Sequence, residues 1–319
     1  MTVKIRAFRI LNRVAILIAS VLVASIVVFL FMAVLPGDPA QVALGVNATP
    51  ELVAKTRAEF GIDRPLVTQY FDWIGGVLQG DFGRSYVTRE AIGPALADRL
   101  GVTLWLVGAG MLVALLIAVP AGTFAAVRHR KADGTAVSAL SQIGVAIPAF
   151  LAGIILVQIF AVQLRWLPSG GWTPPVQDPG EFLRGLVLPA LSLGLVQGAV
   201  LTRYVRSAVL DTLGQDYLRT ARSKGLRPFQ ALFRHGLRNA AVPVVTVLGL
   251  QLATLLIGAV VVERVFVLPG LGSMLLDSVA SRDLLSVQGI VLVLVVGVLL
   301  VNFVVDVLYT VLDPRLRGS

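Results

Sequence analysis

Long uncharged runs of hydrophobic residues dominate the chain, and charged segments separate them. A helix needs about 20 apolar residues to cross the hydrocarbon core of a membrane. Six runs of at least 18 residues carry no charge: Val14–Gly37, Leu100–Val127, Gly134–Leu164, Gly185–Thr202, Asn239–Val262 and Leu284–Val305. The runs are continuous rather than alternating, which favours helices over the strands of a barrel. We therefore predict an all-α integral membrane protein with six transmembrane helices.

Composition agrees with this prediction, because 56% of the residues are hydrophobic and only 14% are charged. There is no cysteine, which excludes disulfides, thiolate chemistry and cysteine-based metal sites. The basic start "MTVKIRAFRILNR" precedes an apolar run that is too long for a signal peptide, and "VLPGDPA" is a poor cleavage site. We expect a retained first helix.

Lysine and arginine predict the orientation in the membrane. With six spans, one side receives 17 of these residues in the termini and short connecting segments, and the short loops of the other side receive four. The basic side faces the cytoplasm. Both termini are therefore predicted to be cytoplasmic, and the net charge of +9 reflects this bias rather than nucleic-acid binding.

The first outside segment, residues 38–99, is long but not of low complexity. "TPELVAKTRAEFGI" predicts a helix that Thr49 caps, Pro50 begins and Gly61 ends. "RPLVTQYFDWIGGVLQG" predicts a second helix over residues 65–80, with aromatic residues suited to the membrane interface. The segment is either a lid over a pathway or a helical cap. Further along, "ERVFVLPGLGSMLLDSVASRD" holds an apolar stretch too short to span, which fits a short helix that dips back among the others.

Polar residues inside the spans either line a pathway or bond to a neighbouring helix, and the sequence leaves both readings open. The candidates are Gln142, Gln158, Gln197, Gln251, Gln288 and Asn302. In the last span, Asn302 shares one helical face with Asp306, Tyr309 and Asp313. We predict that this face packs inside the protein near its cytoplasmic end.

Several chemical motifs are missing. No lysine follows a glycine, so binding of ATP by a P-loop is excluded. The two histidines form no HExxH motif, and no Gly-x-Ser-x-Gly sequence occurs. A zinc peptidase is therefore excluded, and a membrane enzyme of another kind stays a distant alternative.

A basic segment, Arg203–Arg238, interrupts the apolar pattern with eight Lys/Arg and two Asp. Asp216 is placed to cap a helix that runs to Lys224, and Gly225 suits a left-handed stop with Leu226 as its hydrophobic contact. Pro228 then opens a second helix, before Pro243 begins the fifth span. The apolar residues of the second helix share one stripe: Phe229, Leu232, Phe233 and Leu237. Such a helix fits a groove on a partner or a surface of anionic lipid.

The stretch "TARSKGL…FRHGLRNAAVP" resembles the cytoplasmic EAA loop of binding-protein-dependent ABC importer permeases. Gly225 matches the glycine of that pattern and Ala221 its last alanine, whereas Arg219 and Thr220 replace Glu-Ala. These departures are typical of the dipeptide, oligopeptide and nickel branch. Other stretches similar to that branch recur in order along nearly the whole chain: "LPGDP", "FGIDRPLVTQY", "GDFGRS", "VFVLPGLG" and "NFVVDVLYTVLDPR".

The resemblance implies a type I permease fold over residues 1–319, with an extracytoplasmic loop at 38–99 and a cytoplasmic coupling loop at 203–238. It implies one half of a heterodimeric channel in the bacterial inner membrane, with a homologous second permease, two ABC ATPase subunits and an extracytoplasmic binding protein as partners. The resemblance also implies that the chain is a transport subunit rather than an enzyme and holds no cofactor, and that the partner ATPases bind ATP and Mg. The coupling residues would be an apolar set ringed by basic residues around the Gly225 hinge: Ala221, Leu226, Phe229 and Leu232, with Arg219, Arg222, Lys224 and Arg227.

The expected cargo is a short peptide, with nickel or another small solute as the alternative. A different class, the stand-alone secondary carrier, would show inverted repeats, interrupted helices or midplane charges, and none is clear in the sequence. Co-purified ATPases would distinguish an importer subunit from a carrier.

Overall fold

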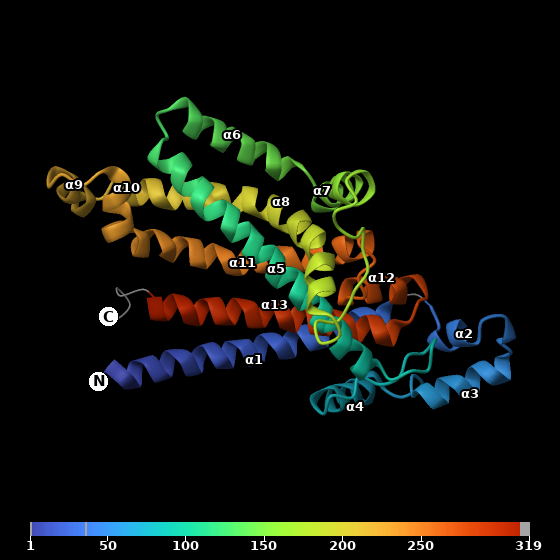
Figure 1. Ribbon diagram of the computed structural model, residues 1–319. Helices are drawn as coiled ribbons and strands as arrows, with labels where there is room; N and C mark the ends of the chain where they lie inside the picture. The colour runs from blue at the N-terminus through green and yellow to red at the C-terminus, as the bar shows by residue number, and fades with distance from the viewer. Residues whose placement is uncertain (1, 36, 313–319) are drawn as a thin grey trace. The chain divides into compact units, whose positions relative to one another are not determined.

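The computed structural model describes residues 2–35 and 37–312, which are mainly helical and contain no strand beyond an isolated bridge between Arg84 and Ala91. Figure 1 shows the helices in order. Their bounds are α1 Thr2–Val34, α2 Pro39–Leu44, α3 Pro50–Phe60, α4 Leu66–Leu78, α5 Ile92–Val127, α6 Ala132–Ala146, α7 Ala149–Leu156, α8 Pro179–Leu213, α9 Asp216–Ser223, α10 Pro228–Ala231, α11 Leu237–Val265, α12 Leu271–Ala280 and α13 Leu284–Leu312. A 3₁₀ turn follows α2, and π-helical turns follow α7 and α10.

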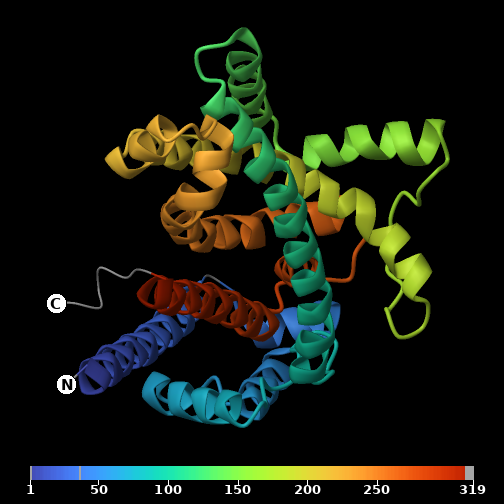
Figure 2. The ribbon, with the colours of Figure 1, turned by 60° about the vertical axis from the view of Figure 1, so that its left-hand side comes forward.

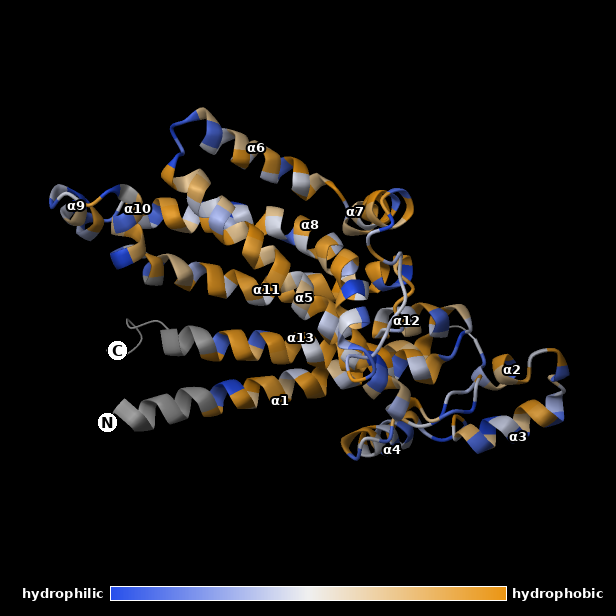
Figure 3. Cartoon of the chain, in the orientation of Figure 1, coloured by the Kyte–Doolittle hydropathy of each residue, from blue (hydrophilic) through white to orange (hydrophobic). Residues whose placement is uncertain are grey.

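Five helices in the described residues are long and apolar enough to cross a membrane, and the number rises to six if one bent pair of helices is counted as a single span. The five candidate spans are Leu11–Val34, Ile92–Val127, Pro179–Leu213, Asn239–Val265 and Leu284–Val307. Each contains one of the predicted runs or most of it. Figure 3 shows these helices as mainly hydrophobic along their length. The predicted all-α architecture with six membrane segments is confirmed.

The third predicted span is not a single helix. α6 and the helix from α7 to Gln163 are bent by 98° at a short break, and Figure 2 shows α7 turning away from α6. Pro148 explains the break, because its ring disfavours helical backbone at the preceding residue, and Ile147 is extended with φ −88° and ψ 122°. The expectation that no span is interrupted is therefore wrong.

The chain divides into two compact units. The first unit contains residues 3–103 and 269–300. Its core joins α5, α12 and α13 through Ile92, Leu96, Leu271 and Ile290. The first turn of α12 is also anchored by a hydrogen bond of 2.9 Å from the Leu271 amide to the Thr103 hydroxyl.

The outside segment of the first unit forms the two predicted helices. Thr49 caps α3 by accepting a hydrogen bond from the Leu52 amide, and Gly61 ends the helix with φ 68°. α4 follows from Leu66 to Leu78. The turn after α4 is held to the start of α13 by Asp283, which is 4% exposed and accepts hydrogen bonds from the hydroxyls of Ser85 and Ser286, both at 2.6 Å.

The second unit contains residues 104–268 and the chain from Val301 onward. α8 is its central helix and packs against α6, α7 and α11. Gly194 lets α5 approach α8 closely, because a Cβ at this position would lie 2.4 Å from a methyl group of Val113. This unit carries the predicted coupling loop.

Candidate functional site

The candidate site is the coupling segment, residues 215–240, which Figure 1 shows at one end of α8 and α11. Its first helix, α9, begins at Asp216, with Gln215 at the N-cap position and no side-chain cap. Asp216 is therefore not the cap that the sequence suggested. It lies in the first turn, where a carboxylate interacts favourably with the helix dipole.

The turn after α9 confirms the predicted stop at Gly225. The glycine has φ 93°, a conformation that residues with a Cβ rarely adopt. Its amide donates to Arg222 O at 2.9 Å, and the Leu226 amide donates to Ala221 O at 3.4 Å. These two bonds form a Schellman motif, in which a hydrophobic contact between Leu226 and Ala221 is expected and both residues belong to one cluster.

The second helix of the segment does not end before the fifth span. α10 begins at Pro228 as predicted, and it continues through the π-helical turn Leu232–Gly236 into α11 without a break. Pro243 lies inside α11 and does not begin it. The segment thus passes directly into a candidate membrane helix.

The first part of the predicted basic loop is also helical. α8 has 35 residues, so it is about 52 Å long, whereas the hydrocarbon core is about 30 Å thick. The residues from Arg203 to Leu213 are the end of α8 rather than a loop. A rigid helix therefore leads to α9 from one side, as α11 does from the other.

Part of the predicted docking stripe is packed within the chain. Leu218, Ala221 and Ala231 form a buried cluster with Leu213 and Leu226 at its edge. Leu232 is 0% exposed. The side chains of Ala221 and Leu232 are therefore covered by the chain itself in this arrangement, whereas Leu226 is half-buried and lines a neighbouring cleft. Docking of the stripe in a groove on a partner stays a prediction.

The exposed face of the segment combines two aromatic rings with basic groups. Phe229 and Phe233 are 52% and 57% exposed, and their ring centroids lie 4.9 Å apart. Figure 3 shows hydrophilic residues along α9, in contrast to the mainly hydrophobic α11. We call this set the coupling surface; its exposed residues are Arg219, Arg222, Lys224, Gly225, Arg227, Phe229 and Phe233.

A cleft of about 370 Å³ lies beside the coupling surface. Its lining includes Tyr217, Lys224, His235 and Asn239. The Asn239 amide donates to the Tyr217 hydroxyl at 2.8 Å, which ties α9 to the start of α11. The sequence did not single out this pair, because its two members are 22 positions apart and only the turn at Gly225 brings them together.

The predicted pathway residues behave differently from one another. Gln197 on α8 donates a hydrogen bond to Gln251 on α11, and both side chains are buried. This contact supports the interpretation that these two residues join neighbouring helices rather than line a pathway. Gln142 and Asn302 are exposed on the surface of the chain, and Gln288 is buried in the first unit.

The polar face of α13 is only partly described. Asn302 and Asp306 are exposed on this chain, so the face does not pack inside the chain at these two positions. The Tyr309 side chain and the whole of Asp313 lie outside the described residues. For Tyr309 and Asp313, packing inside the protein stays a prediction.

Comparison with known proteins identifies the kind of molecule. The family described as "Binding-protein-dependent transport system inner membrane component" matches residues 118–318, and its N-terminal counterpart matches residues 7–107. The glutathione transport system permease protein GsiC of Salmonella typhimurium (strain LT2) is 42% identical over 309 residues, covering 97% of this chain and 98% of the relative. GsiC of Escherichia coli (strain K12) is 40% identical over the same coverage.

A solved structure shows the same fold. The inward-facing MetNI methionine ABC transporter superposes with a TM-score of 0.55 at 19% identity, covering 68% of this chain and 96% of that chain. At this identity the likeness concerns the fold alone. Together with the family matches, it shows that the chain belongs to the binding-protein-dependent inner-membrane permeases of ABC importers, in the peptide and nickel branch.

Proposed function

We propose that the chain forms one half of the translocation pathway for short peptides, with peptides of the size of glutathione as the first candidates. The cargo proposal is supported by the 42% identity to a glutathione permease over 97% of the chain. A second, homologous permease subunit forms the other half, and an extracytoplasmic binding protein delivers the peptide.

The coupling surface transmits the movement of two partner ATPases, which bind ATP and Mg, to the membrane helices. The single observation that carries this proposal is the exposed aromatic pair Phe229 and Phe233 at the end of two long helices. An aromatic pair among basic residues fits the composition of a protein interface better than that of a purely solvated loop. Because α8 and α11 both reach this segment, a movement of the segment is transferred directly to two membrane helices.

A co-purification experiment tests the coupling proposal. The permease, its second permease subunit and the ATPases are expressed together, with a tag on the permease. Replacing Phe229 and Phe233 by alanine should release the ATPases from the permease, while the yield of the permease in the membrane stays unchanged because both rings are largely exposed. Phe71→Ala is the matched control, because Phe71 is 64% exposed but lies on α4, outside the coupling segment. Full retention of the ATPases by the double variant would contradict the proposed surface.

Uptake by the complete importer in proteoliposomes tests the cargo. Radiolabelled glutathione, a dipeptide and nickel are offered separately, each with the binding protein present. ATP-dependent accumulation of a peptide without accumulation of nickel is the expected result. Accumulation of nickel alone would overturn the peptide proposal and leave the ABC importer assignment intact.

A further inference from the structure

A polar cavity of about 250 Å³ lies in the first unit, beside α4 and the first turn of α13. Aromatic residues contribute much of its wall: Phe29, Phe60, Trp73, Phe82 and Tyr86. A neighbouring cavity of about 320 Å³ shares Phe29, Tyr86 and Gln288 with it and extends toward Arg57 and Asp63. We call the two together the α4 cavity.

Two hydrogen-bond donors on the wall of the α4 cavity have no acceptor among the described residues. They are Nε1 of Trp73 and Nε2 of Gln288, and both atoms are buried. Gln288 is only 7% exposed as a residue. Buried polar groups in native proteins nearly always have a partner. A ligand that carries acceptor oxygens would form hydrogen bonds with both donors after small side-chain adjustments.

The ends of two candidate membrane spans place the α4 cavity at the level of lipid headgroups. The first span ends at Val34, next to lining residues Met32 and Leu35, and the last begins at Leu284, which is itself a lining residue. Gln288 lies four residues into that helix, about 6 Å along its axis. α4 also exposes apolar side chains: Leu66, Val67, Phe71 and Leu78. A helix with such a face lies in the membrane interface.

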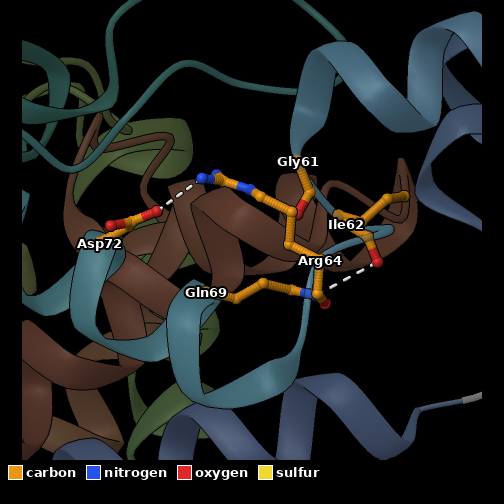
Figure 4. Close-up of polar contacts among 5 residues, drawn as sticks. All are labelled: Gly61, Ile62, Arg64, Gln69 and Asp72. Atoms are coloured by element: carbon orange, nitrogen blue, oxygen red, sulfur yellow. Dashed lines mark hydrogen bonds and ion pairs between the residues drawn. The ribbon is translucent and has the colours of Figure 1, made fainter.

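The charges around the α4 cavity favour a zwitterion over an anion. Arg57 pairs with Asp38 at 2.8 Å, and Arg64 pairs with Asp72 at 2.7 Å, as Figure 4 shows for the second pair. Figure 4 also shows Gln69 directed to the backbone carbonyl of Ile62, which fixes the turn that carries Arg64.

Two further carboxylates, Asp63 and Asp81, line the α4 cavity and form no ion pair among the described residues. The pairs of Arg57 and Arg64 are neutral, so these two carboxylates leave the wall with an excess of negative charge. This excess attracts an ammonium group and repels a lipid with a net negative charge. Each paired arginine still has N–H groups that can contact a phosphate oxygen.

We propose that the α4 cavity binds the headgroup region of a zwitterionic phospholipid with a primary amine, of the phosphatidylethanolamine type. Its ester carbonyl oxygens accept from Trp73 and Gln288. Its phosphate contacts Arg57 or Arg64, and its ammonium group lies toward Asp63 and Asp81. The bound lipid connects the outside segment to the first and last membrane spans.

Native mass spectrometry of the delipidated importer tests the site. Phosphatidylethanolamine and phosphatidylglycerol with the same acyl chains are added back at equal concentrations. The wild type should retain phosphatidylethanolamine preferentially. The double variant Trp73→Phe, Gln288→Leu should bind it about tenfold more weakly, because two hydrogen bonds are lost. The control variant Trp166→Phe, Gln158→Leu changes the same residue types away from the cavity and should bind as the wild type does.

A second variant tests the charge argument independently of the buried donors. Asp63→Asn with Asp81→Asn changes two exposed residues, so folding should be kept, and it should abolish the preference for phosphatidylethanolamine over phosphatidylglycerol. Equal retention of both lipids by the wild type would overturn the proposal. So would unchanged lipid binding by both double variants, or equally tight binding of soluble glycerophosphoethanolamine, which would indicate a solute site instead.

Discussion

Gly225 provides a direct test of the coupling segment, because its role depends on backbone conformation alone. Its φ of 93° is unfavourable for any residue with a Cβ. A Cβ at this position would meet no atom within 4 Å, so Gly225→Ala introduces no clash. The cost is therefore the left-handed conformation itself, about 1–2 kcal/mol.

This cost applies to the turn and not to the fold as a whole. It weakens the two bonds that close the turn, from the amides of Gly225 and Leu226. A penalty of 1–2 kcal/mol corresponds to a factor of roughly 5–30 in an equilibrium constant. We expect the binding of the ATPases to weaken by this factor if the turn must be formed for docking, while six packed membrane segments remain folded.

Two substitutions calibrate the effect. Gly225→Asn should cost less than Gly225→Ala, since asparagine tolerates the left-handed region. Gly214→Ala is the matched control at the end of α8, because Gly214 has φ −75° and its Cβ would make only ordinary contacts.

The assay measures hydrogen exchange of the peptides around residues 221–226 together with the dissociation constant for the purified ATPases. Faster exchange and weaker binding in Gly225→Ala, with wild-type values in Gly214→Ala, are the expected results. The reasoning is refuted if Gly225→Ala and Gly214→Ala behave alike, or if asparagine at position 225 is worse than alanine.

Three further predictions concern the core of the segment, the outside loop and the orientation in the membrane. Leu232→Ala should lower the free energy of unfolding by about 2–5 kcal/mol, because Leu232 is 0% exposed; Phe229→Ala should change it by less than about 1 kcal/mol, and equal effects in chemical unfolding would contradict the packing described. Burial, with a smaller contribution from Asp283, raises the pKa of Tyr86 to about 12. The unfolded chain therefore releases this proton from about pH 10 while the folded chain keeps it, so the folded state loses about 1.4 kcal/mol per pH unit between pH 10 and 12. Tyr86→Phe should remove this loss of stability. Thermal unfolding of the wild type and the variant at pH 8.5 and pH 11 measures it, and the same fall in melting temperature for both proteins would contradict the reasoning. Single cysteines at Gly180 and Gly225 should react with an impermeant thiol reagent on intact cells only at position 180; labelling at 225 and not at 180 would reverse the predicted topology.

Local features of the structure followed directly from local patterns in the sequence. Continuous apolar runs predicted the membrane segments, because the hydrocarbon core admits only backbone that bonds to itself. Thr49, Gly61 and Gly225 predicted the ends of helices, because capping depends on residues within one turn. The break at Pro148 did not follow from the uncharged run that contains it, because apolar composition does not reveal a bend.

Only the tertiary structure decided which residues of each pattern are available for contact. The predicted stripe of Phe229, Leu232, Phe233 and Leu237 looked uniform in sequence, but Leu232 is buried against the chain and Phe229 is exposed. Gln197 and Gln251 are 54 positions apart, and the packing of α8 on α11 makes them partners. The sequence by itself determined which segments are apolar enough to enter the membrane and several helix ends, such as those at Thr49, Gly61 and Gly225, because these properties depend on near neighbours. The assignment of each side chain to a core or to a surface depends on contacts between distant segments, which no local pattern encodes.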